Sequence, residues 1–405
     1  MTPADRPPPQ FQAAHAADAP WPDLVDRCLA RLDAVRPDVA PGVAASGVTL
    51  APHLGFIYVT DLLAEDLPQI LDRLRARTGI ADWIGTTGIG IAANGGTPDL
   101  PVSGAAMETA EYYNVPAMAV MLADWPRDAY RLLAPMTDGS QAALDRHAAW
   151  IKARQPGLGV IHADPHQPGL PARIDLLAAA SGAFLVGGLS SSRGAAPQVA
   201  GELGEDGLSG LLLDSGITVL AGLSQGCSPI GPLHRVTEAD RNIIMSIDGR
   251  PALEVMKEEI GEMLSRDLRR CANYIFVGLP VAGSDTGDYL VRQLTGIDSE
   301  RGWIAVGDLM ERDQQILFAR RDVQTARDDL DRMLQRLKSR LDRPVRGGLY
   351  FSCLSRGVNM FGADAAETRQ ILDTLGDFPL VGFFANGEIS HGRLYGHTGV
   401  LALFL

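Results

Sequence analysis

Continuous apolar runs alternate with amphipathic segments along this chain, and the same order of elements recurs three times. Each recurrence predicts a strand, a helix and a second strand. The segments lie at 55–60, 65–77 and 82–85, at 159–163, 171–180 and 184–187, and at 348–353, 365–375 and 379–382. Apolar strands joined through a helix are typical of a buried parallel pair.

Each second strand ends on a glycine and runs into a small, polar stretch: GTTGIG, GGLSSSRG or GFFANGEISHG. Glycine at a strand exit allows positive φ or the close approach of a backbone or ligand. Divergent repeats and convergence of ordinary α/β units both account for the pattern.

Further periodic segments surround these units. Helices are predicted over 22–35, 251–268 and 322–341, and strands over 242–247, 275–279, 303–306 and 315–318. The last helix is expected to pack on a sheet. The elements predict an α/β chain, with α+β as the alternative, in which helices flank mixed sheets.

Two intimately linked domains are expected, at 21–252 and 253–405, because no Pro/Gly/Ser linker separates them. Residues 1–20 contain five prolines and many alanines and are expected to be disordered.

Composition restricts the classes of partner. The 405 residues carry a net charge of −13, and the pI is about 5.1. This acidity argues against binding to nucleic acid or to an anionic membrane. Four scattered cysteines suggest a reducing compartment, no signal peptide is expected, and no apolar run reaches membrane-spanning length. A cytoplasmic location is therefore expected.

Several familiar motifs occur in part, but the residues around them do not fit the structure that each motif requires. The GLSQG at 222–226 matches a nucleophile elbow, but the following CSPIGP opposes the helix that an elbow requires. His162 and His166 are separated by Pro165, so they do not share a helical face that could bind zinc. Walker and dinucleotide-binding glycine patterns are absent from the sequence.

The third unit carries the richest chemistry. Ser352, Cys353 and Arg356 follow its first strand, while Asn386 and Glu388 follow its second. Ligands gather outside the carboxyl ends of parallel strands, so Arg356 and Glu388 are expected to approach one edge. An arginine that grips a carboxylate and a glutamate that holds an ammonium would suit a zwitterion. Alternatively, the two side chains pair with each other and pin the loops.

Cys353 has two interpretations. It is either a thiolate nucleophile assisted by Arg356, with His391 or His397 as the base, or a buried structural cysteine.

The same stretches resemble a known family. FSCLSRG at 351–357, MFG at 360–362, VGFFANGEI at 381–389 and HTGVL at 397–401 resemble the C-terminal FIST domain. IGTTGIG at 84–90, VGGL at 186–189 and SQGCSPIGP at 224–232 resemble the N-terminal FIST domain. The resemblance covers roughly residues 52–405. Thr86 stands where the family often has cysteine, and Ser228 where it often has arginine.

This resemblance implies a stand-alone bacterial sensory module that binds a small molecule, with amino acids and related metabolites as the suggested class, and is not an enzyme. The chain leaves no room for a kinase, cyclase or F-box, so a separate signalling protein is the expected partner. No cofactor is predicted; a non-covalent haem that senses nitric oxide and an uncharacterised Cys-dependent enzyme are the alternatives. The candidate ligand-binding residues are Arg356, Glu388, Asn386, Cys353, Ser352, Thr86, Thr87, Cys227 and His397.

Overall fold

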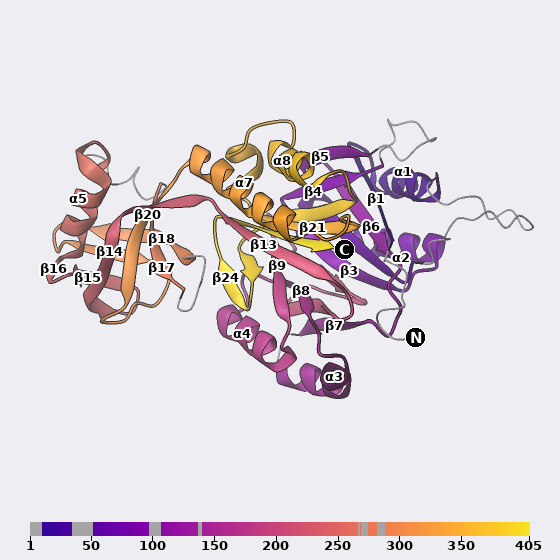
Figure 1. The fold of residues 1–405 in the computed structure, drawn as a ribbon, viewed down its shortest axis with the longest axis horizontal. Helices are drawn as coiled ribbons and strands as arrows, with labels where there is room; N and C mark the ends of the chain where they lie inside the picture. The colour runs from indigo at the N-terminus through magenta and orange to yellow at the C-terminus, as the bar shows by residue number, and fades with distance from the viewer. Residues whose placement is uncertain are drawn as a thin grey trace, which may run out of the picture. The chain divides into compact units, whose positions relative to one another are not determined.

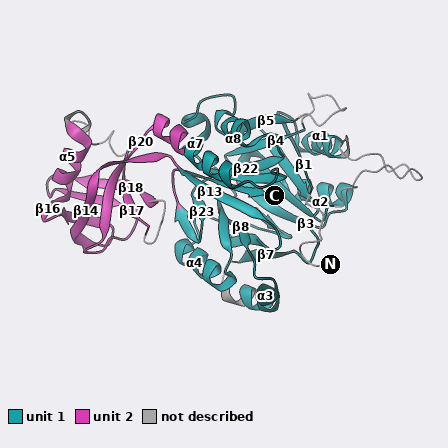
Figure 2. Ribbon diagram, in the orientation of Figure 1, with its two compact units in different colours: residues 1–224, 330–394, 398–405 teal, residues 225–329, 395–397 magenta. Residues whose placement is uncertain are grey.

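A computed structural model describes residues 10–34, 52–96, 107–136, 140–265, 268, 274–281 and 288–405. It divides into two compact units that interleave along the chain (Figure 2). Unit 1 comprises residues 1–224, 330–394 and 398–405, and unit 2 comprises residues 225–329 and 395–397. The predicted boundary near Leu253 lies inside unit 2.

All three predicted strand–helix–strand segments form as expected, and each places its two strands side by side in parallel. They are β2 (Leu54–Thr60), α2 (Leu67–Thr78) and β3 (Asp82–Gly88); β8 (Leu158–Ala163), α4 (Leu170–Ser181) and β9 (Phe184–Leu189); and β21 (Gly347–Cys353), α8 (Ala366–Leu375) and β22 (Leu380–Ala385). Each pair lies inside its own six-stranded sheet of unit 1. The predicted α/β class with mixed sheets is therefore confirmed.

One glycine in each second strand explains part of the shared pattern. A Cβ atom at Gly85, Gly187 or Gly382 would collide with the backbone carbonyl of the residue paired with it on the first strand. Only glycine tolerates so close a backbone approach. The three units thus share a packing constraint as well as an element order.

Around each parallel pair, antiparallel strands complete the sheet (Figure 1). In order across each sheet, the first contains β1 (Phe11–Ala17), β6 (Ala117–Ala123), β2, β3, β10 (Gln198–Ala200) and β11 (Glu202–Gly204). The second contains β24 (Arg393–Tyr395), β23 (Glu388–Ser390), β9, β8, β12 (Leu208–Leu213) and β7 (Tyr130–Met136). The third contains β13 (Val219–Gln225), β25 (Thr398–Phe404), β21, β22, β4 (Gly90–Gly95) and β5 (Glu108–Tyr113).

The inner faces of the three sheets share one apolar core. Tyr58, Val160, Phe351 and Phe383 are all buried in it, so strands of every sheet contribute. Helices cover the outer faces: α1 (Trp21–Ala34) and α2 pack on the first sheet, and α4 on the second, near α3 (Ser140–Arg154). Helix α7 (Val323–Arg340) rests Met333 and Leu337 on β13 at Gly222, as expected for a helix on a sheet.

The expectation of a disordered N-terminus is wrong for residues 10–20. Residues 11–17 form β1, which pairs antiparallel with β6 along its whole length. Phe11 packs against Trp125 and Phe404, each with a ring-centroid distance of 5.3 Å. The prolines and alanines of residues 1–20 suggested disorder. Pairing with β6, a strand from much later in the chain, orders residues 11–17 instead. Residues 1–9 lie outside the described residues.

Unit 2 is a small barrel. Its strands follow the order β14 (Cys227–Asp240), β20 (Gln315–Arg321), β17 (Ile275–Pro280), β18 (Tyr289–Asp298), β19 (Trp303–Val306) and β15 (Ile243–Ile247), with β16 (Arg250–Pro251) beside β15. Pairing of β14 with β15 closes the six strands. Helix α5 (Ala252–Ser265) packs Leu253, Met256 and Ile260 on this barrel.

The sequence prediction omitted β14 and β18. The prolines and glycine of CSPIGP argued against regular structure, yet β14 accommodates them with an irregular register between Ile230 and His234.

Candidate functional site

The carboxyl ends of β21 and β22 lie next to each other, because Cys353 is paired with Ala385. The loop after β21 carries Arg356, and the turn after β22 leads to Glu388 at the start of β23. Both side chains are fully buried. The predicted approach of Arg356 and Glu388 to one edge is therefore correct, and their charges interact closely enough to influence the Glu388 pKa.

Arg356 pairs with a residue that the sequence analysis did not consider. Its Nε donates to Glu367 Oε1 at 2.7 Å, and both side chains are fully buried. The alternative in which Arg356 pairs with Glu388 is thus corrected. The other two guanidinium nitrogens make long contacts to Ser224, at 3.4 and 3.5 Å, and the ring of Phe361 lies 5.0 Å from the guanidinium carbon.

Glu367 is held by four groups in addition to its own helix. Besides Arg356, it accepts hydrogen bonds from Tyr350 Oη at 2.6 Å, from Ser352 Oγ at 3.0 and 3.1 Å, and from the backbone N–H of Gly357 at 2.8 Å. A buried ion pair contributes to a fold only when such bonds satisfy the remaining lone pairs. Ser352, a predicted ligand-binding residue, therefore serves the Arg356–Glu367 pair.

Glu388 is satisfied on one side only. The backbone N–H and the hydroxyl of Thr398 donate to its Oε2 at 3.0 and 2.7 Å. Its Oε1 makes no hydrogen bond of standard geometry within the described part of the chain. Burial raises the pKa of Glu388 to about 8, although the Thr398 bonds, the Arg356 charge and the Cys353 thiol each oppose that shift. This carboxyl is therefore largely protonated at neutral pH.

Cys353 marks the more accessible side of the cluster. It is half-buried, as are its neighbours Leu354 and Ser355, whereas Glu388 beneath it is fully enclosed. The Ser355 hydroxyl donates to Cys353 Sγ at 3.2 Å, and the thiol interacts in turn with Glu388. Cys353 thus links the enclosed Glu388 carboxyl to the partly exposed loop after β21.

Thr86 and Thr87 lie on β3 and are fully buried. The Thr86 hydroxyl is 2.6 Å from the Ser190 hydroxyl and donates to the Pro197 carbonyl at 3.1 Å. These bonds tie β3 to the loop after β9. The Thr87 hydroxyl has no hydrogen-bond partner among the described residues.

Asn386 is exposed, and its backbone N–H donates to Leu189 at 3.0 Å.

The remaining two predicted residues belong to unit 2. Cys227 begins β14, and its carbonyl accepts a hydrogen bond from Tyr289 Oη at 2.6 Å. The His397 carbonyl accepts from the Gly226 N–H at 2.8 Å, and its ring lies 4.4 Å from that of Phe276.

Ser224, the serine of the GLSQG motif, lies within a strand. Ser224 lies in β13, which continues through Gly226 into the strand β14, so no helix follows it. The failure of the elbow context is confirmed. Its buried side chain instead faces Arg356, a contact that the motif did not suggest.

A second carboxyl adjoins the cluster from β5. Glu111 Oε1 accepts hydrogen bonds from the backbone N–H and hydroxyl of Thr368, at 3.1 and 2.8 Å. Burial, and then the charge of Glu367, raise the pKa of Glu111 to about 7. Sequence reasoning missed it because an alternating strand residue carries no signal that it faces a helix start far along the chain.

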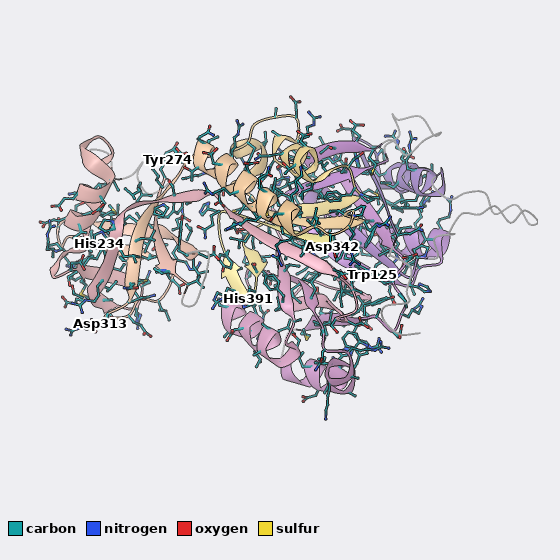
Figure 3. All side chains as sticks on the ribbon, viewed as in Figure 1. Trp125, His234, Tyr274, Asp313, Asp342 and His391 are labelled. Atoms are coloured by element: carbon teal, nitrogen blue, oxygen red, sulfur yellow. The ribbon has the colours of Figure 1, made fainter. Side chains whose placement is uncertain are left out.

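The histidines bear on the metal and haem alternatives. Among the described residues, no group of three His, Cys, Asp or Glu side chains is placed to hold a metal ion. His162 is fully buried and contacts Tyr58 Oη at 3.2 Å, with the rings of Phe351 and Phe383 against it. Three aromatic rings therefore lie edge-to-face with this imidazole. His391 is exposed (Figure 3).

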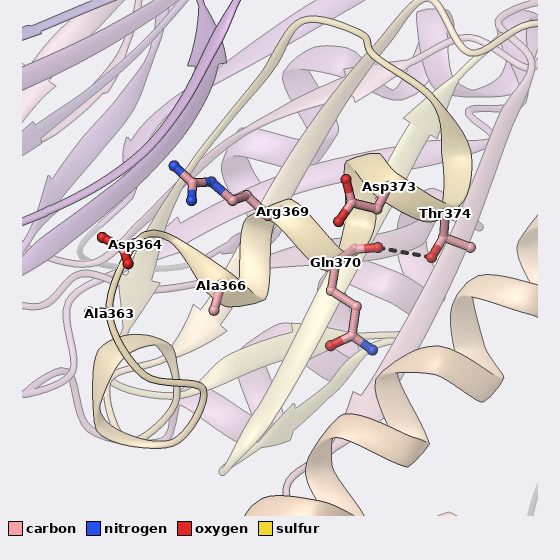
Figure 4. Close-up of a pocket in the computed structure, with 7 residues that line it drawn as sticks. All are labelled: Ala363, Asp364, Ala366, Arg369, Gln370, Asp373 and Thr374. Carbon is pink, nitrogen blue, oxygen red and sulfur yellow. Dashed lines mark hydrogen bonds between the residues drawn. The ribbon is translucent and has the colours of Figure 1, made fainter.

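A separate open depression lies over the outer face of α8, with a volume of about 420 Å³ (Figure 4). Its lining consists of Ala363, Asp364, Ala366, Arg369, Gln370, Asp373 and Thr374. None of these is a predicted site residue.

Across the described ranges, no helix is both long and apolar enough to cross a membrane.

Part of this chain is similar in sequence to known proteins, and most of it matches the models of two protein domains. An uncharacterized protein of Mycobacterium tuberculosis is 37% identical over 191 residues, which are 45% of this chain and 50% of that protein. An uncharacterized protein of Mycobacterium bovis is 36% identical over 192 residues, with the same coverage. The chain thus spans about half the length of the curated relatives it matches.

Residues 53–250 match the FIST N domain and residues 252–391 match the FIST C domain. On this evidence the chain belongs to the FIST family, which has been proposed to act as a sensory module in signal transduction.

Proposed function

We propose that this chain is a small-ligand-binding sensory protein of intracellular signal transduction, and that it recognises an amino acid or a related metabolite at the cluster of Cys353, Arg356 and Glu388. Binding, and not catalysis, is the proposed activity. A separate signalling protein would read the liganded state.

One observation carries the proposal. Glu388 is fully buried, yet its Oε1 has no hydrogen bond of standard geometry, at the carboxyl edge of a parallel strand pair. Buried polar atoms in native proteins are nearly always satisfied, so an orphaned one calls for an explanation. A ligand that supplies the missing donor would explain it, and parallel strand ends are where ligands commonly bind.

The surrounding geometry supports a preorganised site. Arg356 is fixed by Glu367, and Glu388 is fixed by Thr398 on one oxygen only. A receptor whose polar groups are already oriented loses little entropy on binding.

A ligand screen tests the proposal. Purified protein is heated with each of the common amino acids and related amines. Ligand that binds the native state alone stabilises it by about 2.7 kcal/mol at a hundredfold excess over Kd. A selective rise in Tm is expected, and it should be lost in Glu388→Gln. The matched control is Glu202→Gln, which makes the same side-chain replacement at an exposed position of β11.

If no compound raises the Tm, the ligand-binding proposal is wrong. If a rise persists unchanged in Glu388→Gln, the ligand binds elsewhere.

A further inference from the structure

We infer that the site selects its ligand through an amino group held by Glu388, and that Arg356 does not receive the ligand's carboxylate. This inference rests on the proposed function and narrows it from zwitterions in general to primary amines, with or without a carboxylate.

Arg356 is already occupied. Its Nε and its charge are taken by Glu367, which is itself held by Tyr350, Ser352 and Gly357. To grip a carboxylate in a bidentate manner, the guanidinium would have to present two parallel N–H groups to open space.

The far end of the guanidinium is enclosed as well. Its two terminal nitrogens lie against Ser224, and its flat face lies over Phe361. A Cβ atom added to Gly399 would come within 3.3 Å of Nη2, so backbone also closes that side. Arg356 is thus a structural cation, fully buried, with no surface for a ligand.

Glu388 offers the complementary chemistry. The Oε2 of this carboxyl is bonded by Thr398, whereas its Oε1 has no hydrogen bond of standard geometry and Cys353 offers the carboxyl only a weak thiol donor. An ammonium carries three N–H donors. The thiol of Cys353 stands on the accessible side of Glu388, so a slender group is favoured there.

The local charge favours the same ligand. One guanidinium, on Arg356, faces the carboxyls of Glu367 and Glu388, and Glu111 adds a third carboxyl on the other side of Glu367. Once Glu388 has released its proton, these groups carry more negative than positive charge, so an ammonium ligand would reduce the excess and an anionic ligand would increase it. The cation of Arg356 lowers the pKa of Glu388, but burial outweighs it, so the carboxyl keeps a raised pKa.

Matched compounds separate the two groups of an amino acid. For each side chain, calorimetry compares the amino acid, the amine that lacks the carboxylate, and the acid that lacks the amino group. The amine is expected to keep its affinity within about tenfold of the amino acid. The acid should lose at least about a hundredfold, as expected when a buried charged acceptor is left unpaired.

Protons provide a second readout. Glu388 is largely protonated at pH 7, and it must release its proton to pair with an ammonium. Titrations at pH 7 in buffers of different ionisation enthalpy should therefore show that close to one proton is released per amine bound. Glu388→Gln should abolish this release, and Glu202→Gln should leave it intact.

The outcomes distinguish the inference from the proposed function. If the acids bind as tightly as the amino acids, and if Arg356→Lys destroys that binding while the protein stays folded, the ligand is read as an anion. The sensory proposal would then survive and this inference would fail. If nothing in the series binds, both fail. If amines bind without proton release, Glu388 is not their receptor and the inference is also overturned.

Discussion

Replacing Glu388 by glutamine is expected to flatten the pH dependence of stability between pH 6 and pH 8. Glutamine keeps the size of the side chain and an acceptor oxygen for Thr398, but it cannot ionise. The variant therefore removes one titration from the buried cluster and leaves the packing nearly unchanged.

The sign follows from the direction of the shift. Burial raises the pKa of Glu388 from its ordinary 4.5 to about 8. Between these values the folded state holds a proton that the unfolded state has lost, so the free energy of unfolding falls as pH rises through this window and levels off above about pH 8. Each pH unit is worth about 1.4 kcal/mol. From pH 6 to pH 8 the wild type should lose about 2 kcal/mol more than the variant.

Urea unfolding monitored by tryptophan fluorescence measures this difference. Of the five tryptophans, only Trp303 belongs to unit 2, and Trp83 and Trp125 are buried in cores of unit 1, so the signal mainly follows the unit that contains Glu388. Glu111 also has a raised pKa, but it is present in both proteins and its contribution cancels in the comparison. Glu202→Gln makes the same replacement at an exposed position, so it serves as the control and should follow the wild type.

Parallel stability profiles for wild type and Glu388→Gln from pH 6 to pH 8 would refute the reasoning. They would mean that Glu388 ionises normally, hence that solvent or another cation reaches it in the folded protein.

Three further changes test other parts of the structure. Glu367→Gln leaves the charge of Arg356 buried without its partner, and it should reduce the free energy of unfolding by about 3–5 kcal/mol; a loss below about 1 kcal/mol would show that the pair is solvated. Gly382→Ala places a methyl group against a backbone carbonyl and should destabilise the protein by about 3 kcal/mol, whereas Gly194→Ala, which has open space, should be nearly neutral in the same urea assay. Phe11→Ala should cost about 3 kcal/mol, because Phe11 is buried against two aromatic rings; no change in Tm would mean that β1 contributes nothing to the fold.

The repeated strand–helix–strand units could be predicted because their signal is local. Each unit pairs strands that are about thirty residues apart, and the apolar runs alone identify both of them. Neighbours from distant sequence could not be found in this way. The pairing of Leu380 with Asn94 and the burial of Phe11 against Phe404 depend on segments that share no periodic pattern.

The sequence predicted where the candidate site lies, but it did not predict which residue pairs with Arg356. Strand ends placed Arg356 and Glu388 at one edge, as the register of β21 and β22 requires. The actual partner of Arg356 is Glu367, in the first turn of α8. An acidic residue at a helix start is equally well explained by the helix dipole, so its charge pointed to no particular arginine.

The order in which the ribosome makes the strands limits when the third sheet of unit 1 can form. The third sheet of unit 1 takes β4 and β5 from before the barrel segment, and β21, β22 and β25 from after it. While a ribosome is still producing residues 225–329, β4 therefore has no β22 beside it, and the apolar face of the first sheet lacks its Phe351 and Phe383 neighbours. Pairings of such long sequence separation form late, and open strand edges attract other chains. Chains that stop before β21 should therefore aggregate, and slow elongation through the barrel should prolong the period in which the nascent chain depends on chaperones.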